Sequence, residues 1–348
     1  MRTKIGIACN VKPRELVELG LDEEPPSTGH GGEDTYAEWD TASTVRAVER
    51  ALNSKYDTAF LIANSRFEEK LARTPVDLVF NMAEGLHGTF RESLVPAILE
   101  DRGIPYTGSD PLTLALSLDK ARTKEVLAFH GIPTPAFAVV HDAADLAGLD
   151  GFEIPAMVKP VAEGSSKGIY DANCVRERSA LAPKVRELLE RYRQPVLVEA
   201  FLPGREFTVA VLGNPPRRQV LPIVEINFGE LPPGANPIYS YEAKWVWDTP
   251  EKPLNMFTCP APLDPTLRQA IERAVLGACR VLRVRDWCRV DVRLDAAGAP
   301  HVMELNPLPG ILPDPEENSC FPKAAAAAGM TYEEMIHRVV DSAIERQG

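Results

Sequence analysis

The sequence lacks a long hydrophobic run, closely spaced cysteines and an excess of positive charge. The apolar run near the N-terminus covers four residues before Asn10 and Lys12, too short for the core of a signal peptide. No stretch approaches the roughly 20 apolar residues that a membrane-spanning helix needs. The six cysteines are scattered without a CxxC pair, which predicts reduced packing residues rather than a zinc site or disulfides. We therefore expect a cytoplasmic protein with no membrane partner.

The charge balance argues against nucleic acid as a partner. The chain of 348 residues carries 38 Lys and Arg against 50 Asp and Glu, a formal net charge of −12. Nonspecific nucleic-acid binding draws mainly on Lys and Arg that neutralise phosphates, so this composition does not favour it. The phosphate-binding signature GxxxxGK[ST] is also missing. A local basic pocket remains compatible with the composition.

The N-terminal third has the pattern of a small parallel α/β domain. Short buried strands are predicted at residues 4–9, 57–64 and 76–82, with helical patterns between and after them. Alternating strands and helices favour a parallel sheet, in a domain that ends near Leu118. The stretch from residue 20 to about 35 is rich in Pro and Gly and is predicted to be a surface loop.

The rest of the chain predicts two further α+β units. Strands are expected at residues 154–160, 195–202 and 205–213, and a helix at 176–192. A long helix at 265–282 places one apolar stripe toward a sheet, formed by Leu267, Ile271, Ala274, Ala278 and Leu282. We divide the chain into an N-terminal domain (1–118), a central domain (119–203) and a C-terminal domain (204–348).

Residues 287–310 predict a β-hairpin that carries facing acidic side chains. A four-residue connection over 296–299 pairs Asp295 with Pro300. Because paired residues in such a hairpin have residue numbers that add to the same total, Asp291 is expected to pair with Glu304. Because side chains alternate along a strand, one face carries Arg289, Asp291, Glu304 and Asn306. The other face carries Val290, Val292, Met303 and Leu305.

Like charges opposite each other are destabilising, so a positive group is expected between the two carboxylates. Mg²⁺ takes carboxylate and amide oxygens, usually together with substrate phosphates. The hairpin is therefore a candidate Mg²⁺–nucleotide site, and the alternative is an acidic face in water.

A loop at residues 163–168, EGSSKG, follows the strand that contains Lys159. Glycines let backbone N–H groups approach an anion, so the loop could close over phosphates, although a flexible connection has the same composition. An unpaired ammonium is costly to bury, so Lys159 needs an anionic partner. Glu199 and Glu206 flank a Pro-Gly turn and are either exposed or placed to accept hydrogen bonds from adenine and ribose.

These stretches, in this order from about Tyr106 to Met330, resemble the ATP-grasp superfamily and, within it, the D-alanine–D-alanine ligase family. The matching motifs are YTGSDPLTLALSLDKARTK, VKPVAEGSSKG, VLVEAFLPGREFTV, YSYEAKW, CRVDVRLDAAGAPHVMELNPLPG and NSCFPKAAAAAGM. The resemblance implies a Rossmann-like α/β N-terminal domain, a small central α+β lid domain and a C-terminal α+β domain, with ATP between the last two. It also implies an ATP-dependent carboxylate–amine ligase of the acid–amino acid type. A homodimer is expected because relatives pair through the N-terminal domain.

The resemblance assigns roles to particular residues of this chain. It implies that ATP contacts Lys120, Lys159, Glu163, Gly164, Ser165, Ser166, Glu199, Ala200, Phe201, Leu202, Glu206 and Lys244. It implies that Asp291, Glu304 and Asn306 bind two Mg²⁺ ions, for which Mn²⁺ could substitute. Catalysis is assigned to Arg289, which would face the developing oxyanion, and to Ser165, Lys244 and Gly310. The 163–168 loop and residues 225–250 are expected to act as lids.

Departures from the family pattern fall where its amino-acid substrates bind. The glutamate that holds the first substrate has its nearest match in Glu38, with Asp40 equally placed. Glu84 stands where the family has a histidine, and Trp245 replaces a tyrosine. Ser319 is the match to the serine that binds the acceptor's carboxylate. A site that hydrogen-bonds its substrate rejects analogues strongly, so we expect an altered substrate.

We expect Trp245 to close over the first substrate, the alternative being that its ring packs away from the site. Three other functions stay open beside a ligase of altered specificity. They are D-alanine–D-alanine ligation itself, a nucleotide-binding protein without turnover, and a phosphoryl transferase that stops at a phosphorylated product.

Overall fold

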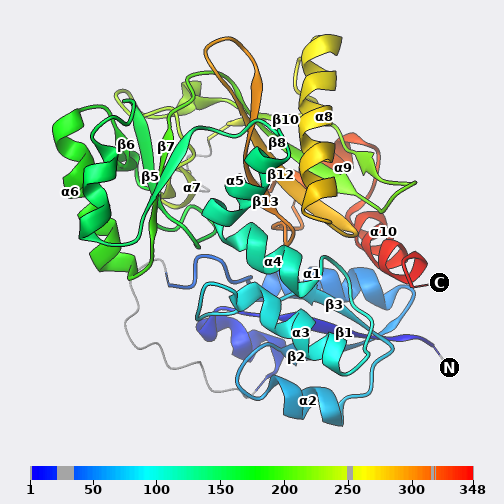
Figure 1. The fold of residues 1–348 in the computed structure, drawn as a ribbon. Coiled ribbons are helices and arrows are strands. Elements are labelled where there is room, and N and C mark those ends of the chain that lie inside the picture. Colours follow the sequence, from blue (N-terminus) through cyan, green and yellow to red (C-terminus); the bar gives the residue numbers. More distant parts are fainter. Residues whose placement is uncertain (1, 22–34, 249–253, 315–316, 318, 348) are drawn as a thin grey trace.

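The structure is a computed structural model that describes residues 2–21, 35–248, 254–314, 317 and 319–347. Three sheets follow one another along the chain. Figure 1 shows the N-terminal part (blue to cyan) below, the central part (green) above it to the left, and the C-terminal part (yellow to red) to the right. Most of the predicted loop at 20–35 lies outside the described residues.

The N-terminal sheet is parallel, as predicted, and has the order β2-β1-β3. Its strands are β1 (Lys4–Cys9), β2 (Asp57–Ile62) and β3 (Leu78–Met82). The surrounding elements are η1 (Pro13–Leu19), α1 (Ala42–Asn53), α2 (Phe67–Arg73), η2 (Arg91–Ser93), α3 (Leu94–Asp101) and α4 (Pro111–Leu118). Helix α1 begins where the Thr41 hydroxyl accepts a hydrogen bond from the Thr44 N–H, and it buries Val45, Val48 and Leu52.

The central sheet is antiparallel, with the order β4-β7-β5-β6. Its strands are β4 (Phe137–Val140), β5 (Ala156–Pro160), β6 (Cys174–Val175) and β7 (Val196–Ala200). Helix α6 (Arg178–Tyr192) buries Leu181, Val185 and Leu188 against this sheet. The chain enters the domain through α5 (Lys120–Phe129), and two short turns, η3 (Ala143–Leu149) and η4 (Asp171–Asn173), complete it.

The C-terminal sheet has six strands, in the order β11-β10-β8-β12-β13, with β9 beside β8. The strands are β8 (Glu206–Leu212), β9 (Gln219–Val220), β10 (Val224–Ile226), β11 (Phe257–Thr258), β12 (Trp287–Leu294) and β13 (Pro300–Asn306). Helix α8 (Pro265–Val281) packs on the sheet through Ile271, Ala274 and Ala278, as the apolar stripe predicts. The remaining helices are α9 (Cys320–Ala327) and α10 (Tyr332–Glu345).

Part of the predicted lid at 225–250 is regular rather than open loop. It contains η5 (Phe228–Glu230) and the short helix α7 (Tyr241–Trp245), which begins where the Ser240 hydroxyl accepts from the Ala243 N–H. Residues 249–250 of this predicted lid lie outside the described part of the chain.

The β12–β13 hairpin pairs Arg289 with Asn306 and Asp291 with Glu304, as predicted. The prediction was wrong nearer the turn, where Pro300 pairs with Leu294 instead of Asp295. A bulge after Asp291 absorbs the extra residue, so Val302 takes the core position opposite Val292.

Because of the bulge, the prediction that Met303 faces the core was also wrong. This residue lies against a cavity beside Glu304 instead of in the core with Val290 and Leu305.

One hydrophobic core joins the N-terminal and C-terminal parts of the chain. Trp287 of β12 makes edge contacts with Phe80 of β3 and Phe321 of α9, each with ring centroids 5.6 Å apart. Helix α10 returns to lie beside α1, near the chain's starting strand (Figure 1). The hairpin base is therefore fixed to the N-terminal domain. Among the described residues, no helix is both long and apolar enough to cross a membrane.

Candidate functional site

Two cavities meet on the polar face of the hairpin. The first, here called the intersheet cavity, lies between the central and C-terminal sheets and is lined by Lys159, Glu199, Glu206 and Asp291 among others. The second, here called the acidic cavity, lies between the hairpin and the N-terminal domain. Its lining includes Glu38, Asp40, Glu84 and Glu92. Both cavities are lined by Glu163, Gly164, Ser165, Lys244, Arg289 and Glu304.

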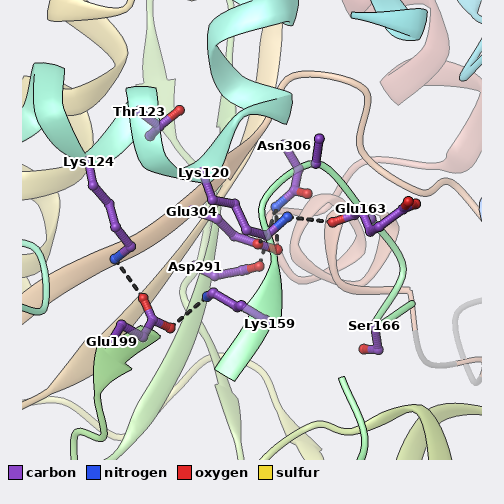
Figure 2. A network of polar contacts seen from close by, with 12 residues as sticks. Lys120, Thr123, Lys124, Lys159, Glu163, Ser166, Glu199, Asp291, Glu304 and Asn306 are labelled. Carbon is purple, nitrogen blue, oxygen red and sulfur yellow. Dashed lines mark hydrogen bonds and ion pairs between the residues drawn. The ribbon is translucent and has the colours of Figure 1, made fainter. Parts of the chain in front are cut away.

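The hairpin brings its four predicted side chains together. Arg289 makes two hydrogen bonds to Asp291, Nε to Oδ1 at 3.2 Å and Nη2 to Oδ2 at 3.0 Å. The Asn306 amide donates to Asp291 Oδ2 at 3.3 Å and to Glu304 Oε1 at 3.5 Å. Lys120 Nζ lies 3.4 Å from Glu304 Oε2. Figure 2 shows Lys120 close to Asp291, Glu304 and Asn306. The cation expected between the carboxylates is thus supplied by protein groups here.

The charges of the hairpin suit a divalent cation. Burial alone would raise the pKa of Glu304, but Lys120 and neighbouring cations outweigh it and lower the pKa to about 2. Burial raises the pKa of Asp291, although Arg289 opposes the shift. Within the described residues, no three His, Cys, Asp or Glu side chains cluster as a metal site. Two carboxylates and an amide therefore form an incomplete oxygen set, which fits Mg²⁺ that also binds phosphates.

Lys159 has the buried anionic partner that its position in a strand requires. Its Nζ lies 2.6 Å from Glu199 Oε1, and Lys124 Nζ lies 2.8 Å from Glu199 Oε2 (Figure 2). Lys124 is fully buried and also donates to the Thr134 hydroxyl at 2.9 Å. Burial lowers the pKa of Lys124 to about 8, although Glu199 opposes the shift.

Our sequence reasoning missed Lys124. The signal was available, because Lys124 follows Lys120 by four residues and helical spacing puts both on one face. The Lys124–Glu199–Lys159 group leaves Glu199 only 1% exposed, so its two oxygens serve the lysines rather than open solvent.

Glu206 is held across the sheet by a residue that the sequence prediction omitted. Arg293 donates from Nη1 to Glu206 Oε2 at 2.7 Å and from Nη2 to the Pro237 carbonyl at 2.8 Å. The guanidinium also lies over the ring of Phe201, 4.7 Å from its centroid. Apolar side chains complete this end of the intersheet cavity: Met157, Ile169, Ile226, Ile238 and Met303.

Three residues predicted to contact ATP do not line this cavity. Ala200, Phe201 and Leu202 follow the buried Glu199 and are absent from the described cavity wall. Phe201 packs with Met157 and Ile238, which do line the cavity.

The 163–168 loop lies over the junction of the two cavities. Ser165 and Ser166 both have left-handed backbones, with φ of 48° and 60°. The Gly164 N–H donates to Glu38 Oε1 at 2.6 Å, and the Ser166 hydroxyl donates to the Tyr239 carbonyl at 2.9 Å. The loop therefore contacts the N-terminal and C-terminal domains at once, as a closed lid would.

Two lysines reach the junction from opposite sides. Lys120 begins α5 and donates to the Glu163 carbonyl. Lys244 lies on α7, and its side-chain ammonium makes no hydrogen bond or ion pair with any described residue. Burial lowers the pKa of Lys244 to about 8, and the like charge of Arg289 adds to that effect. Lys244 is thus a cation without an anion, facing both cavities.

Both candidate N-terminal acids line the acidic cavity, but their surroundings differ. Glu38 lies 2.5 Å from Arg91 Nη2, so its charge is compensated. Arg91 also donates to the Ala162 carbonyl at 2.9 Å, and our sequence reasoning did not identify it. Asp40 has no side-chain hydrogen bond or ion pair within the described residues, and burial raises its pKa to about 7. Glu84 lies in the same wall, and its role as a substrate residue stays a prediction.

Two residues predicted to bind substrate line neither cavity. Trp245 lines neither cavity and is 42% exposed, and its Nε1 donates to the Ser165 carbonyl at 3.3 Å. The ring therefore contacts the 163–168 loop from outside the two cavities. Ser319 also lies off both cavities, because its hydroxyl donates to the Gly310 carbonyl at 3.0 Å and accepts from the Leu312 N–H. Gly310 itself lines the acidic cavity.

Comparison with known proteins gives a consistent result. The profile of the family described as "D-ala D-ala ligase C-terminus" matches residues 126–341. An uncharacterized protein, y4sG, from Sinorhizobium fredii is 36% identical over 293 residues, which cover 83% of this chain and 82% of that protein. A D-alanine–D-alanine ligase from Cupriavidus taiwanensis is 34% identical over 275 residues, covering 79% of this chain and 78% of the ligase.

Solved structures share the whole fold. The D-alanine–D-alanine ligase of Bacillus anthracis in complex with ATP superimposes with a TM-score of 0.72 at 22% identity, covering 100% of both chains. The VanG D-Ala:D-Ser ligase of Enterococcus faecalis gives a TM-score of 0.72 at 20% identity, covering 99% of this chain and 100% of that one. At these identities the likeness concerns the fold.

Proposed function

The chain belongs to the D-alanine–D-alanine ligase family of the ATP-grasp superfamily, and from that premise we propose that it joins two amino acids, or an amino acid and a similar amine. It is an ATP-dependent ligase that forms carbon–nitrogen bonds. One observation carries the proposal of substrates: the intersheet and acidic cavities share a wall in which Lys244 and Arg289 face both sides. A nucleotide on one side and an amino acid on the other would meet at these cations.

The intersheet cavity is proposed to hold ATP. Its apolar end suits a purine, and Glu206, already fixed by Arg293, keeps its second oxygen for ribose hydroxyls. Glu199 would act mainly by holding Lys159 toward the phosphates. Asp291, Glu304 and Asn306 would hold Mg²⁺, which supplies charge neutralisation at the phosphates.

The proposed reaction has two steps. A carboxylate oxygen of the donor attacks the γ-phosphorus of ATP, and the bond from that phosphorus to ADP breaks, leaving an acyl phosphate. The amine nitrogen of the acceptor, after losing a proton, attacks the carbonyl carbon, and the bond to phosphate breaks to leave an amide. Lys120 and Lys244 would stabilise the transferring phosphoryl group, which is supported by Lys244 lining both cavities and Lys120 lining the acidic cavity beside Glu304.

Arg289 is proposed to stabilise the oxyanion of the second step. Its guanidinium lines both cavities and is fixed by two hydrogen bonds to Asp291. Preorganised donors cost no reorganisation when charge develops, so such a fixed cation is effective. The 163–168 loop, with Ser165 at the junction, would exclude water from the acyl phosphate.

The test is phosphate release from ATP across a panel of D- and L-amino acids, with products identified by mass. We expect release that depends on an amino acid, together with a product that has lost one water relative to its two substrates. Turnover without an amide product would favour a phosphoryl transferase. Nucleotide binding without turnover would favour a silent binding protein.

D-Alanine–D-alanine ligation is the second candidate, supported by relatives that carry that name at 34% identity. The acidic cavity argues for a different substrate, because the N-terminal side of its described wall alone carries four carboxylates. A homodimer is proposed as well, and light scattering that reports a monomer at working concentration would contradict it.

A further inference from the structure

The N-terminal wall of the acidic cavity carries three carboxylates without partners. Asp40, Glu84 and Glu92 make no side-chain hydrogen bond or ion pair with any residue that the structure describes. Glu38 differs, because Arg91 and the Gly164 N–H both bind it. These three carboxyl groups are thus acidic groups whose charge the neighbouring cations compensate only in part.

Glu92 shows that this charge is built into the fold. It lies on η2, is only 8% exposed and still lines the cavity. Ser117 of α4 lines the same cavity, and its buried hydroxyl has no hydrogen-bond partner in the described chain. A buried carboxylate without a partner is costly, so a cationic ligand bound at this cavity wall would stabilise its charged form.

The three carboxylates come from separate, fixed elements. Asp40 forms a parallel β-bridge with Val11, which lies just after β1. Glu84 follows β3. Burial and mutual repulsion raise the pKa of Glu84 well above its usual value, and burial raises that of Glu92 to about 7 although Arg91 opposes it. Lys12 offsets only part of the shift at Asp40. A bound cation would relieve this repulsion.

An inorganic cation does not fit these groups well. Within the described residues, no three acidic, His or Cys side chains approach closely enough to form a metal site. The carboxylates come from three separate segments of the wall, which suits an organic cation with several N–H donors. The α-ammonium of an ordinary amino acid supplies only one positive charge for three carboxylates.

We propose that the acyl-donor substrate is a diamino acid, whose side-chain ammonium or guanidinium binds between Glu84, Glu92 and Asp40. This inference rests on the proposed ligase function. The donor's carboxylate must reach Lys244 and Arg289 at the junction, so its other end extends toward the N-terminal wall. The acceptor's attacking amine must be neutral, so that amine is not the group that binds these carboxylates.

Paired amino acids of equal length test the proposal. Lysine is compared with norleucine and ornithine with norvaline, each as D and L forms, with and without alanine as a second amino acid. Phosphate release gives kcat/KM, and tandem mass spectrometry identifies which residue supplied the carboxyl group. A charged hydrogen bond is worth about 1.5–3 kcal/mol, so the cationic member should be favoured as donor by about 10-fold or more.

Variants locate the preference. Glu92→Gln keeps the shape and removes the charge, so it should reduce the cationic-to-neutral ratio by about 10-fold. Glu84→Gln should reduce the ratio as well, which protects the test against a Glu92 variant that folds poorly. Glu153→Gln, which removes the same charge at an exposed position of the central domain, should leave the ratio unchanged.

The outcomes separate this inference from the proposed function. If amides form but the neutral partner is used as well as the cationic one, the diamino-acid donor is wrong while the ligase stands. If the ratio is high but unchanged in both variants, the cation binds elsewhere and the assignment fails. If no amino acid gives an amide, the proposed function and this inference fail together.

Discussion

Glu199→Gln perturbs the only carboxylate that lies between Lys124 and Lys159 in the described structure. Wild-type Glu199 approaches both ammonium groups, at 2.8 Å and 2.6 Å, and all three side chains are almost fully buried. Glutamine keeps the size but removes the charge, so two buried ammonium groups are left facing each other. Removing one partner of a buried ion pair costs roughly 3–5 kcal/mol.

The expected loss lies near the lower end of that range. The pKa of Lys124 is already lowered to about 8, so Lys124 can release its proton at neutral pH for little free energy. We therefore expect Glu199→Gln to lower the free energy of unfolding by about 3 kcal/mol at pH 7.

The pH dependence has a definite sign. In the variant, the folded-state pKa of Lys124 falls further below its unfolded value, so the folded state binds fewer protons. Stability then rises with pH between those two values. The difference in the free energy of unfolding between wild type and variant should consequently become smaller from pH 7 to pH 9.

Urea unfolding followed by circular dichroism at both pH values measures this gap. The matched control is Glu187→Gln, which loses an exposed ion pair to Lys184 and should change stability by less than about 1 kcal/mol. A loss below about 1 kcal/mol for Glu199→Gln, or a gap that widens with pH, would refute the reasoning.

Three further predictions concern the site. Asp291→Asn should lower kcat by about 100-fold or more and weaken the Mg²⁺ dependence while the fold persists. Glu304→Gln should lower kcat at least as much. A variant that unfolds but keeps its Mg²⁺ dependence would show that Asp291 and Glu304 are structural. Because the pKa of Lys244 is lowered to about 8, kcat/KM for ATP should fall as pH rises through 8, and Lys244→Arg should remove that limb of the profile; an unchanged profile excludes Lys244. Trp245→Tyr should alter the ratio of kcat/KM between substrates by less than about twofold, because the ring lies outside both cavities, and a large change would return Trp245 to the substrate site.

The polar pairs of the hairpin were predictable. They follow from the alternation of side chains along each strand and from the constant total of the residue numbers of paired residues. The pairs Asp291 with Glu304 and Arg289 with Asn306 are both present. The bulge was not predictable, since it depends on Val302 rather than Met303 fitting the core under β12. A local pattern therefore found the site face but not the extra residue that turns Met303 into the cavity.

Residues that act across domains were harder to find. Arg91 matters because it meets Glu38, 53 positions away, and the Ala162 carbonyl, 71 positions away. The first contact lies within the N-terminal domain and the second joins it to the central domain, so neither follows from a local sequence pattern. Ser319 and Trp245 show the limit of matching motif positions, because that match does not give the hydrogen bonds of their side chains to the Gly310 and Ser165 carbonyls.

The central claim is that ATP in the intersheet cavity activates an amino-acid carboxylate in the acidic cavity. Positional isotope transfer tests it most directly: a donor amino acid labelled with ¹⁸O in its carboxyl group is turned over with ATP, and the released phosphate is analysed by mass. An acyl-phosphate route predicts that one ¹⁸O atom per amide formed appears in inorganic phosphate. Amide formation with unlabelled phosphate would contradict the account.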